Sequence, residues 1–160
     1  MKNKNKAQII LIVLFSFSLI SCGYKKVIQS NESLIHINKI NVQSGNKKLM
    51  YLVKNEIMLI SKENAKNKID IQLKLNKNKI GKIKDKSGKI TRYTIELQAE
   101  ISFKKTDNPK VISRSFSESN DYDIADNHFS TINRENTVTK NLVEGLSEDI
   151  TRYLILYFKN

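Results

Sequence analysis

The clearest hydrophobic pattern in the chain lies in residues 91–103, where apolar and polar positions alternate. The apolar positions are Tyr93, Ile95, Leu97, Ala99, Ile101 and Phe103. A period of two places these side chains on one side of the backbone, so the pattern predicts a β-strand with one buried face. Shorter segments with alternating or β-branched apolar residues predict three further strands at 34–42, 68–76 and 111–119.

Two other segments repeat apolar residues every three or four positions, which is the period of an amphipathic helix. In 47–63 the repeating positions are Leu49, Leu52, Val53, Ile57 and Ile60. In 126–158 they are Phe129, Ile132, Thr139, Leu142, Val143, Leu146, Ile150, Tyr153, Leu154 and Tyr157. The second helix would be about 50 Å long. Because that exceeds the predicted sheet, we expect a bend or an overhang near Gly145.

The predicted order of elements is therefore strand, helix, strand, strand, strand, helix. Turn residues at Ser87-Gly88 and around Pro109 separate the last three strands and predict an antiparallel meander with one dry face. Each element has one apolar side. The expected fold is an α+β two-layer sandwich in which two helices pack on a mainly antiparallel sheet of about four strands. We expect residues 34–160 to form this single domain.

The start of the chain has a different pattern. Residues 1–6 contain Lys2, Lys4 and Lys6, and the 14 residues from 7 to 20 carry no charge. A basic start followed by a short apolar run is the layout of a secretory signal peptide. A permanent transmembrane helix is a weaker interpretation, because spanning a bilayer takes about 20 apolar residues. We therefore expect residues 1–21 to be a signal peptide that is cleaved.

The only cysteine of the chain, Cys22, follows this apolar run directly. The sequence Leu19-Ile20-Ser21-Cys22 resembles the lipobox of bacterial lipoproteins. The resemblance implies cleavage before Cys22, a thioether-linked diacylglycerol on its sulfur, and acylation, for example with palmitate, of the new amino group. The alternative is a buried cysteine after an uncleaved helix. With cleavage before Cys22, residues 22–33 form the lipidated N-terminus and tether. Gly23 points to the outer membrane, because an Asp at this position would favour the inner membrane.

The chain is strongly basic, with 28 Lys and Arg residues against 16 Asp and Glu. Removing residues 1–21 lowers the formal charge from +12 to +9. An exported protein does not meet nucleic acid, so the expected partners are lipid headgroups, lipopolysaccharide phosphates or acidic proteins. The frequent use of Lys, Asn and Ile throughout offers a compositional explanation for part of this charge.

Basic residues are densest between residues 74 and 92, which contain a single acid, Asp85. Lysines on an edge hairpin can simply prevent aggregation. They can also bind phosphates, and on this basis we select a candidate lipopolysaccharide-binding group. The group consists of Lys82, Lys84, Lys86, Lys89 and Arg92.

No motif for catalysis, a metal or a cofactor is present, so we expect a protein that is not an enzyme. The acidic residues Glu118, Asp121 and Asp123 lie close together but lack the glycine and the closing glutamate of a calcium loop. We interpret them as acidic residues at the N-terminus of the following helix, where they complement its dipole.

Taken together, the chain resembles the LptE family of lipopolysaccharide-assembly lipoproteins. The resemblance rests on a lipobox followed by Cys22-Gly23-Tyr24, a strand and a helix, the long strand RYTIELQAEISF, a second strand ending in SNDYD, and a long C-terminal amphipathic helix. It implies a non-enzymatic outer-membrane lipoprotein on the periplasmic side, partly inside the lumen of an LptD-type β-barrel. The implied role is to plug and stabilise that barrel, to bind lipopolysaccharide and to assist its insertion in the outer leaflet.

Two other functions remain open from the sequence. One is a structural lipoprotein that scaffolds a different envelope assembly or secretion machine. The other is a lipid-anchored hydrolase, which would need a cleft with a nucleophile and a positioned base.

Overall fold

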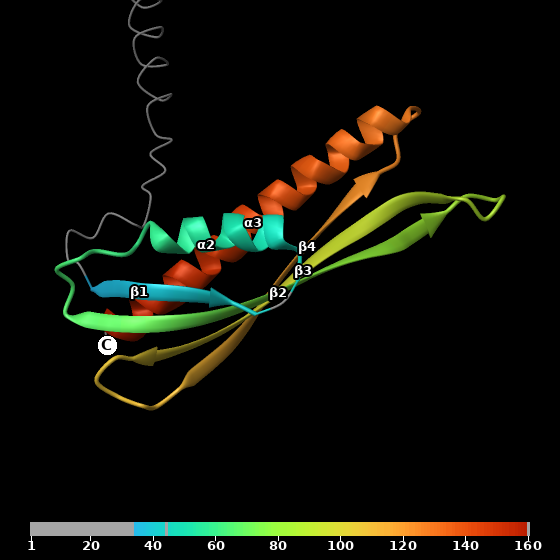
Figure 1. The fold of residues 1–160 in the computed structure, drawn as a ribbon. Coiled ribbons are helices and arrows are strands. Elements are labelled where there is room, and N and C mark those ends of the chain that lie inside the picture. The colour runs from blue at the N-terminus through green and yellow to red at the C-terminus, as the bar shows by residue number, and fades with distance from the viewer. Residues whose placement is uncertain (1–33, 44, 160) are drawn as a thin grey trace, which may run out of the picture. The chain divides into compact units, whose positions relative to one another are not determined.

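The computed structural model describes residues 34–43 and 45–159. The signal peptide at 1–21, the tether at 22–33 and Cys22 all lie outside these residues. The described elements are β1 (Ile35–Val42), α2 (Lys47–Met58), β2 (Asn67–Lys84), β3 (Ile90–Lys105), β4 (Ile112–Asp123) and α3 (His128–Lys159), and Figure 1 shows their arrangement. This order confirms the predicted α+β fold.

The four strands form one sheet in the order β1-β2-β3-β4. β1 pairs with β2 in parallel, and the other two pairs are antiparallel. The predicted meander of β2, β3 and β4 is therefore confirmed. Helix α2 provides the crossover that a parallel β1–β2 pair requires. The register of β1 shifts between Ile37 and Lys39, so Asn38 is an extra residue at that edge.

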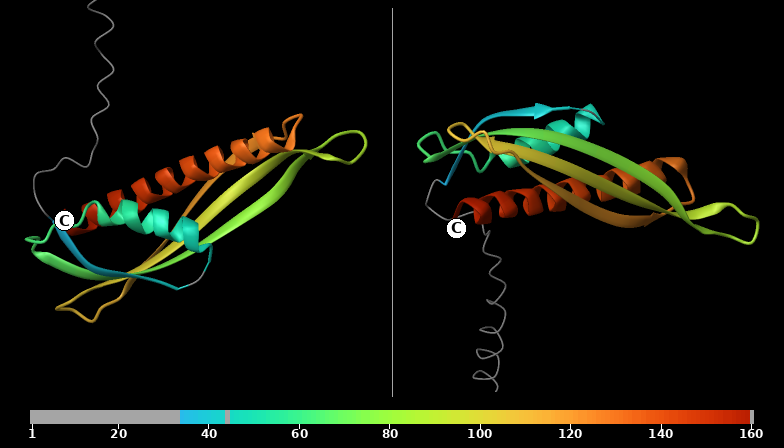
Figure 2. Two further views of the ribbon diagram at one scale, coloured as in Figure 1. Left: turned by 45° about the horizontal axis from the view of Figure 1, so that its top comes forward. Right: turned by 90° about the horizontal axis from the view of Figure 1, so that it is seen from below.

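One face of the sheet is apolar and covered by both helices, as the two views in Figure 2 show. β2 buries every second residue from Ile69 to Leu75, and β3 does the same from Ile95 to Phe103. α3 contributes a buried stripe from Thr139 to Leu154. The core is thus formed by the alternation predicted from the sequence, packed against the two helical stripes.

The connection from β1 to α2 requires a glycine. Gly45 has φ of 124°, and a Cβ at this position would collide with the carbonyl oxygen of Leu75. Asn46 then caps the helix, since its side chain accepts a hydrogen bond of 3.2 Å from the Leu49 amide. This close approach places α2 directly over β2.

Three boundaries differ from the predictions by four residues or more. α2 ends at Met58 rather than 63, and β2 continues to Lys84 through residues that we interpreted as a hairpin region. β4 continues to Asp123, so the acidic residues lie in a strand. α3 runs without a break through Gly145, and its first turns extend beyond the core, because the buried residues begin at Thr139.

Candidate functional site

The second half of β2, its turn and the start of β3 form a hairpin arm, defined here as residues 77–93. Figures 1 and 2 show the arm projecting past both helices. Residues 78–89 of the arm are exposed to solvent. The arm carries the whole predicted lipopolysaccharide-binding group, so we examined each of its cations.

The tip of the arm is a tight turn held by Asp85. The Asp85 amide donates to the Lys89 carbonyl (2.9 Å), and the Gly88 amide donates back to the Asp85 carbonyl (3.0 Å). One carboxylate oxygen of Asp85 accepts from Ser87 and from the Lys89 amide, and these bonds hold its pKa below the usual range. Gly88 has φ of 82°, a conformation that favours glycine at this turn position.

A polar cluster joins the base of the arm to α3. Glu135 accepts hydrogen bonds from Lys77 (3.0 Å), Lys79 (2.7 Å) and the Tyr122 hydroxyl (2.8 Å). Lys79 also lies 4.4 Å from the centre of the Tyr93 ring, which stacks on Tyr122. Burial alone would raise the pKa of Glu135, but the bonds from Lys79, Lys77 and Tyr122 outweigh it and lower the pKa to about 2.

Two further ion pairs join the arm to β4. Lys82 lies 2.5 Å from Asp121, which also accepts from the Thr94 hydroxyl (2.7 Å). Arg92 donates to both carboxylate oxygens of Asp123, at 2.6 and 3.2 Å. The bonds from Lys82 and Arg92 hold the pKa values of Asp121 and Asp123 below their usual range.

The structure therefore divides the predicted lipopolysaccharide-binding group. Lys82 and Arg92 form ion pairs, whereas Lys84, Lys86 and Lys89 at the tip form no salt bridge with any described residue. The Glu135 cluster was not predicted from the sequence. The sequence does contain a sign of this cluster: Glu135 lies three residues after Ile132 and four before Thr139. This spacing places a charged residue on the apolar stripe of the predicted helix.

The acidic patch is neither a calcium loop nor a helix terminus. Asp121 and Asp123 face away from the helices, whereas Glu118 lies on the helix side of β4, next to Gly145. The first turn of α3 contains no acidic residue, so our interpretation based on the helix dipole was wrong. Within residues 34–43 and 45–159, no three acidic, histidine or cysteine side chains are grouped so that they could hold a metal ion.

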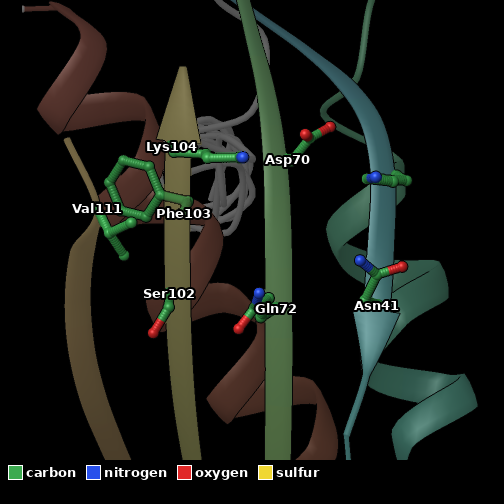
Figure 3. A pocket seen from close by; sticks show the side chains of 8 residues that line it. Asn41, Asp70, Gln72, Ser102, Phe103, Lys104 and Val111 are labelled. Carbon is green, nitrogen blue, oxygen red and sulfur yellow. The ribbon is translucent and has the colours of Figure 1, made fainter. Parts of the chain in front are cut away.

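The second face of the sheet is polar, and neither α2 nor α3 covers it. This face carries a hollow of about 110 Å³. Its lining residues include Asn41, Asp70, Gln72 and Ser102, whose side chains are labelled in Figure 3. Ser102 hydrogen-bonds Ser113 across the strands at 2.8 Å. The face thus offers hydroxyl and amide groups to water or to another polar surface.

The comparisons with known proteins concern this fold. Rare lipoprotein B from Shewanella oneidensis superimposes with a TM-score of 0.58 at 13% identity, over 75% of this chain and 96% of that chain. An uncharacterized lipoprotein B from Nitrosomonas europaea gives a TM-score of 0.50 at 11% identity, over 79% and 84%. The chain shares its fold with bacterial lipoproteins. No protein-family model matches the sequence, and no curated protein matches it significantly.

The lipobox predicted at Cys22 lies outside the described residues and stays a prediction. In the part of the chain that the structure describes, none of the helices combines the length and the apolar character needed to cross a membrane.

Proposed function

We propose that this protein is an outer-membrane lipoprotein that plugs and stabilises an LptD-type β-barrel and assists lipopolysaccharide assembly at the outer leaflet. Two findings support an envelope lipoprotein: the order of charge, apolar run, serine and cysteine at residues 1–22, and a fold shared with bacterial lipoproteins. The proposed role is non-enzymatic.

The observation that carries the proposal is the hairpin arm. Three ammonium groups, of Lys84, Lys86 and Lys89, lie at the tip of an arm whose other cations form ion pairs with Glu135, Asp121 and Asp123. The ion pairs fix the arm against β4 and α3, so the tip cations are presented at a defined position. Ammonium groups in this arrangement suit the phosphates of lipopolysaccharide.

The surface of the domain also suits a barrel interior. The lumen of a large outer-membrane barrel is polar, so a plug must present charged and hydrogen-bonding groups rather than apolar ones. The uncovered face of the sheet does so along β4, where Ser113, Ser115, Ser117 and Ser119 alternate with inward-facing residues. These short hydroxyls allow close approach of a second polar surface.

The first experiment is a pull-down of the intact chain from outer-membrane extract, followed by mass spectrometry. We expect a large β-barrel in roughly equal amount. The Cys22→Ala variant serves as the control, because it removes the lipid attachment and should abolish recovery from the outer-membrane fraction while leaving the domain folded. Recovery of secretion or peptidoglycan-associated components in place of a barrel would instead support the scaffolding function.

A further inference from the structure

The end of the domain opposite the hairpin tip has its own surface chemistry. We call it the basal end and define it as Leu34 with residues 59–68, 104–111 and 156–159. Figure 1 shows the start of β1, the β3–β4 turn and the C-terminus at this end. The Lys62 amide donates to the Ile35 carbonyl (3.0 Å), and the ring of Phe103 lies 5.2 Å from that of Tyr157. These contacts bring segments distant in sequence to one surface.

The basal end is rich in lysines that lack counter-charges. It contains seven lysines and only two acidic residues, Glu63 and Asp107. The lysines are Lys62, Lys66, Lys68, Lys104, Lys105, Lys110 and Lys159. None of them forms a salt bridge with another residue in the described part of the chain, in contrast to Lys77, Lys79, Lys82 and Arg92 on the hairpin arm.

Apolar side chains are exposed among these lysines. Leu59 is 69% exposed, Val111 is 59% exposed and Leu156 is 53% exposed. Leu59 follows α2, Val111 precedes β4 and Leu156 lies near the end of α3, so they come from three separate segments of the basal end. Apolar groups next to uncompensated lysines are the composition of surfaces that insert into the headgroup region of a bilayer.

A hollow of about 400 Å³ lies within this surface. It is lined by Lys66, Asn67, Lys68, Lys105, Thr106 and Asp107. Three of these residues carry an ammonium group and only one, Asp107, carries a carboxylate. Such a hollow can accept an anionic headgroup.

We propose that the basal end docks on an anionic phospholipid surface, with Lys66, Lys68 and Lys105 facing the headgroup phosphates and Leu59 and Leu156 entering the interface. The chain enters the domain at Leu34, on this same end. The 12 residues of the tether, 22–33, reach at most about 40 Å when extended. This inference rests on the membrane attachment through Cys22 and is independent of the proposed barrel.

The test uses tryptophan fluorescence in the full chain, which contains no native tryptophan. Leu156→Trp places a reporter at the basal end, and Phe129→Trp places one at the opposite end of α3, where Phe129 is 73% exposed. Each variant is reconstituted into vesicles of brominated phosphatidylglycerol. We expect strong quenching of L156W and little quenching of F129W. Exchanging the lipid for brominated phosphatidylcholine, or screening with about 1 M salt, should abolish the difference.

A charge comparison completes the design. In the L156W chain, Lys66→Gln, Lys68→Gln and Lys105→Gln together should weaken docking by about 100-fold and remove the quenching. The equal charge change at Lys84, Lys86 and Lys89 should leave it intact. Absence of quenching in L156W, or equal quenching of F129W, would overturn the inference. If L156W is quenched but the pull-down recovers no barrel, the docking inference holds and the barrel proposal fails.

Discussion

At the scale of single residues, Glu135 determines how the hairpin arm meets α3. Its carboxylate accepts from two ammonium groups and a tyrosine hydroxyl, while its side chain is only 23% exposed. A carboxylate in this position keeps Lys77 and Lys79 next to each other on the helix side of β2. Without its charge, these two lysines would repel each other beside Tyr122.

Glu135→Gln should lower the free energy of unfolding by about 1–2 kcal/mol at neutral pH, because two ammonium groups lose their counter-charge. The native pKa of about 2 lies below the unfolded value, so the stabilisation is present above about pH 5 and is lost as the pH falls towards 2. The wild type and the variant should therefore converge through this window. Urea unfolding followed by circular dichroism at several pH values measures this.

Glu144→Gln is the matched control for this prediction. Glu144 also faces a lysine, Lys140 at 3.7 Å, but both side chains are largely exposed. Its loss should change the free energy of unfolding by less than about 0.5 kcal/mol at any pH. Equal effects of the two substitutions would show that the Glu135 cluster adds nothing beyond a surface ion pair.

At the scale of elements, the sequence predicted a strand or a helix wherever one face is buried. The alternation from Ile69 to Leu75 identified β2, and the pattern in β3 was complete. Beyond Leu75 the apolar alternation ends, because Lys77 and Lys79 occupy the inner face of β2, where they bind Glu135 of α3. The strand continues because it pairs with β3 at Ile95 and Tyr93. Pairing with a distant segment leaves no pattern in the local sequence from which it could be predicted.

The same reason explains the exposed start of α3. Phe129 and Ile132 fit the predicted apolar stripe, yet both are exposed because the first turns of α3 extend past the core. The parallel direction of β1 could not be predicted, since a strand pattern does not specify its partner. At the candidate site, the sequence located the basic arm. It could not separate paired from unpaired cations, because Asp121, Asp123 and Glu135 are distant in sequence.

The hairpin arm also has a prediction of its own. Lys84→Gln, Lys86→Gln and Lys89→Gln together should weaken lipopolysaccharide binding by about 10–100-fold without changing stability, because the three side chains are exposed. A variant with Lys47, Lys48 and Lys74 changed to Gln carries the same charge difference elsewhere and should bind normally. Titration of purified lipopolysaccharide measures both, and equal affinity of the two variants would contradict a specific role for the tip.

At the scale of the whole domain, stability should be unevenly distributed. The core lies between the helices and the parts of β2 and β3 that bury alternate residues, Ile69 to Leu75 and Ile95 to Phe103. Residues 78–89, in contrast, are exposed. Amide hydrogen exchange should be at least about 100-fold slower at Ile71 and Leu73 than at Ile80 and Ile83, although all four lie in β2. Uniform protection along β2 would mean that the arm unfolds only with the core.

The length of β2 has a consequence for both proposals. Its 18 residues run from the basal end to the hairpin tip, a distance of about 55–60 Å for an extended strand. A bilayer with its headgroup regions is about 40–45 Å thick. An upright domain with its basal end at one headgroup layer would therefore hold Lys84, Lys86 and Lys89 beyond the opposite layer, and a tilted domain would hold them level with it. Inserting two residues on each side of the hairpin would move the tip outwards by about 7 Å and keep every side chain on its own face.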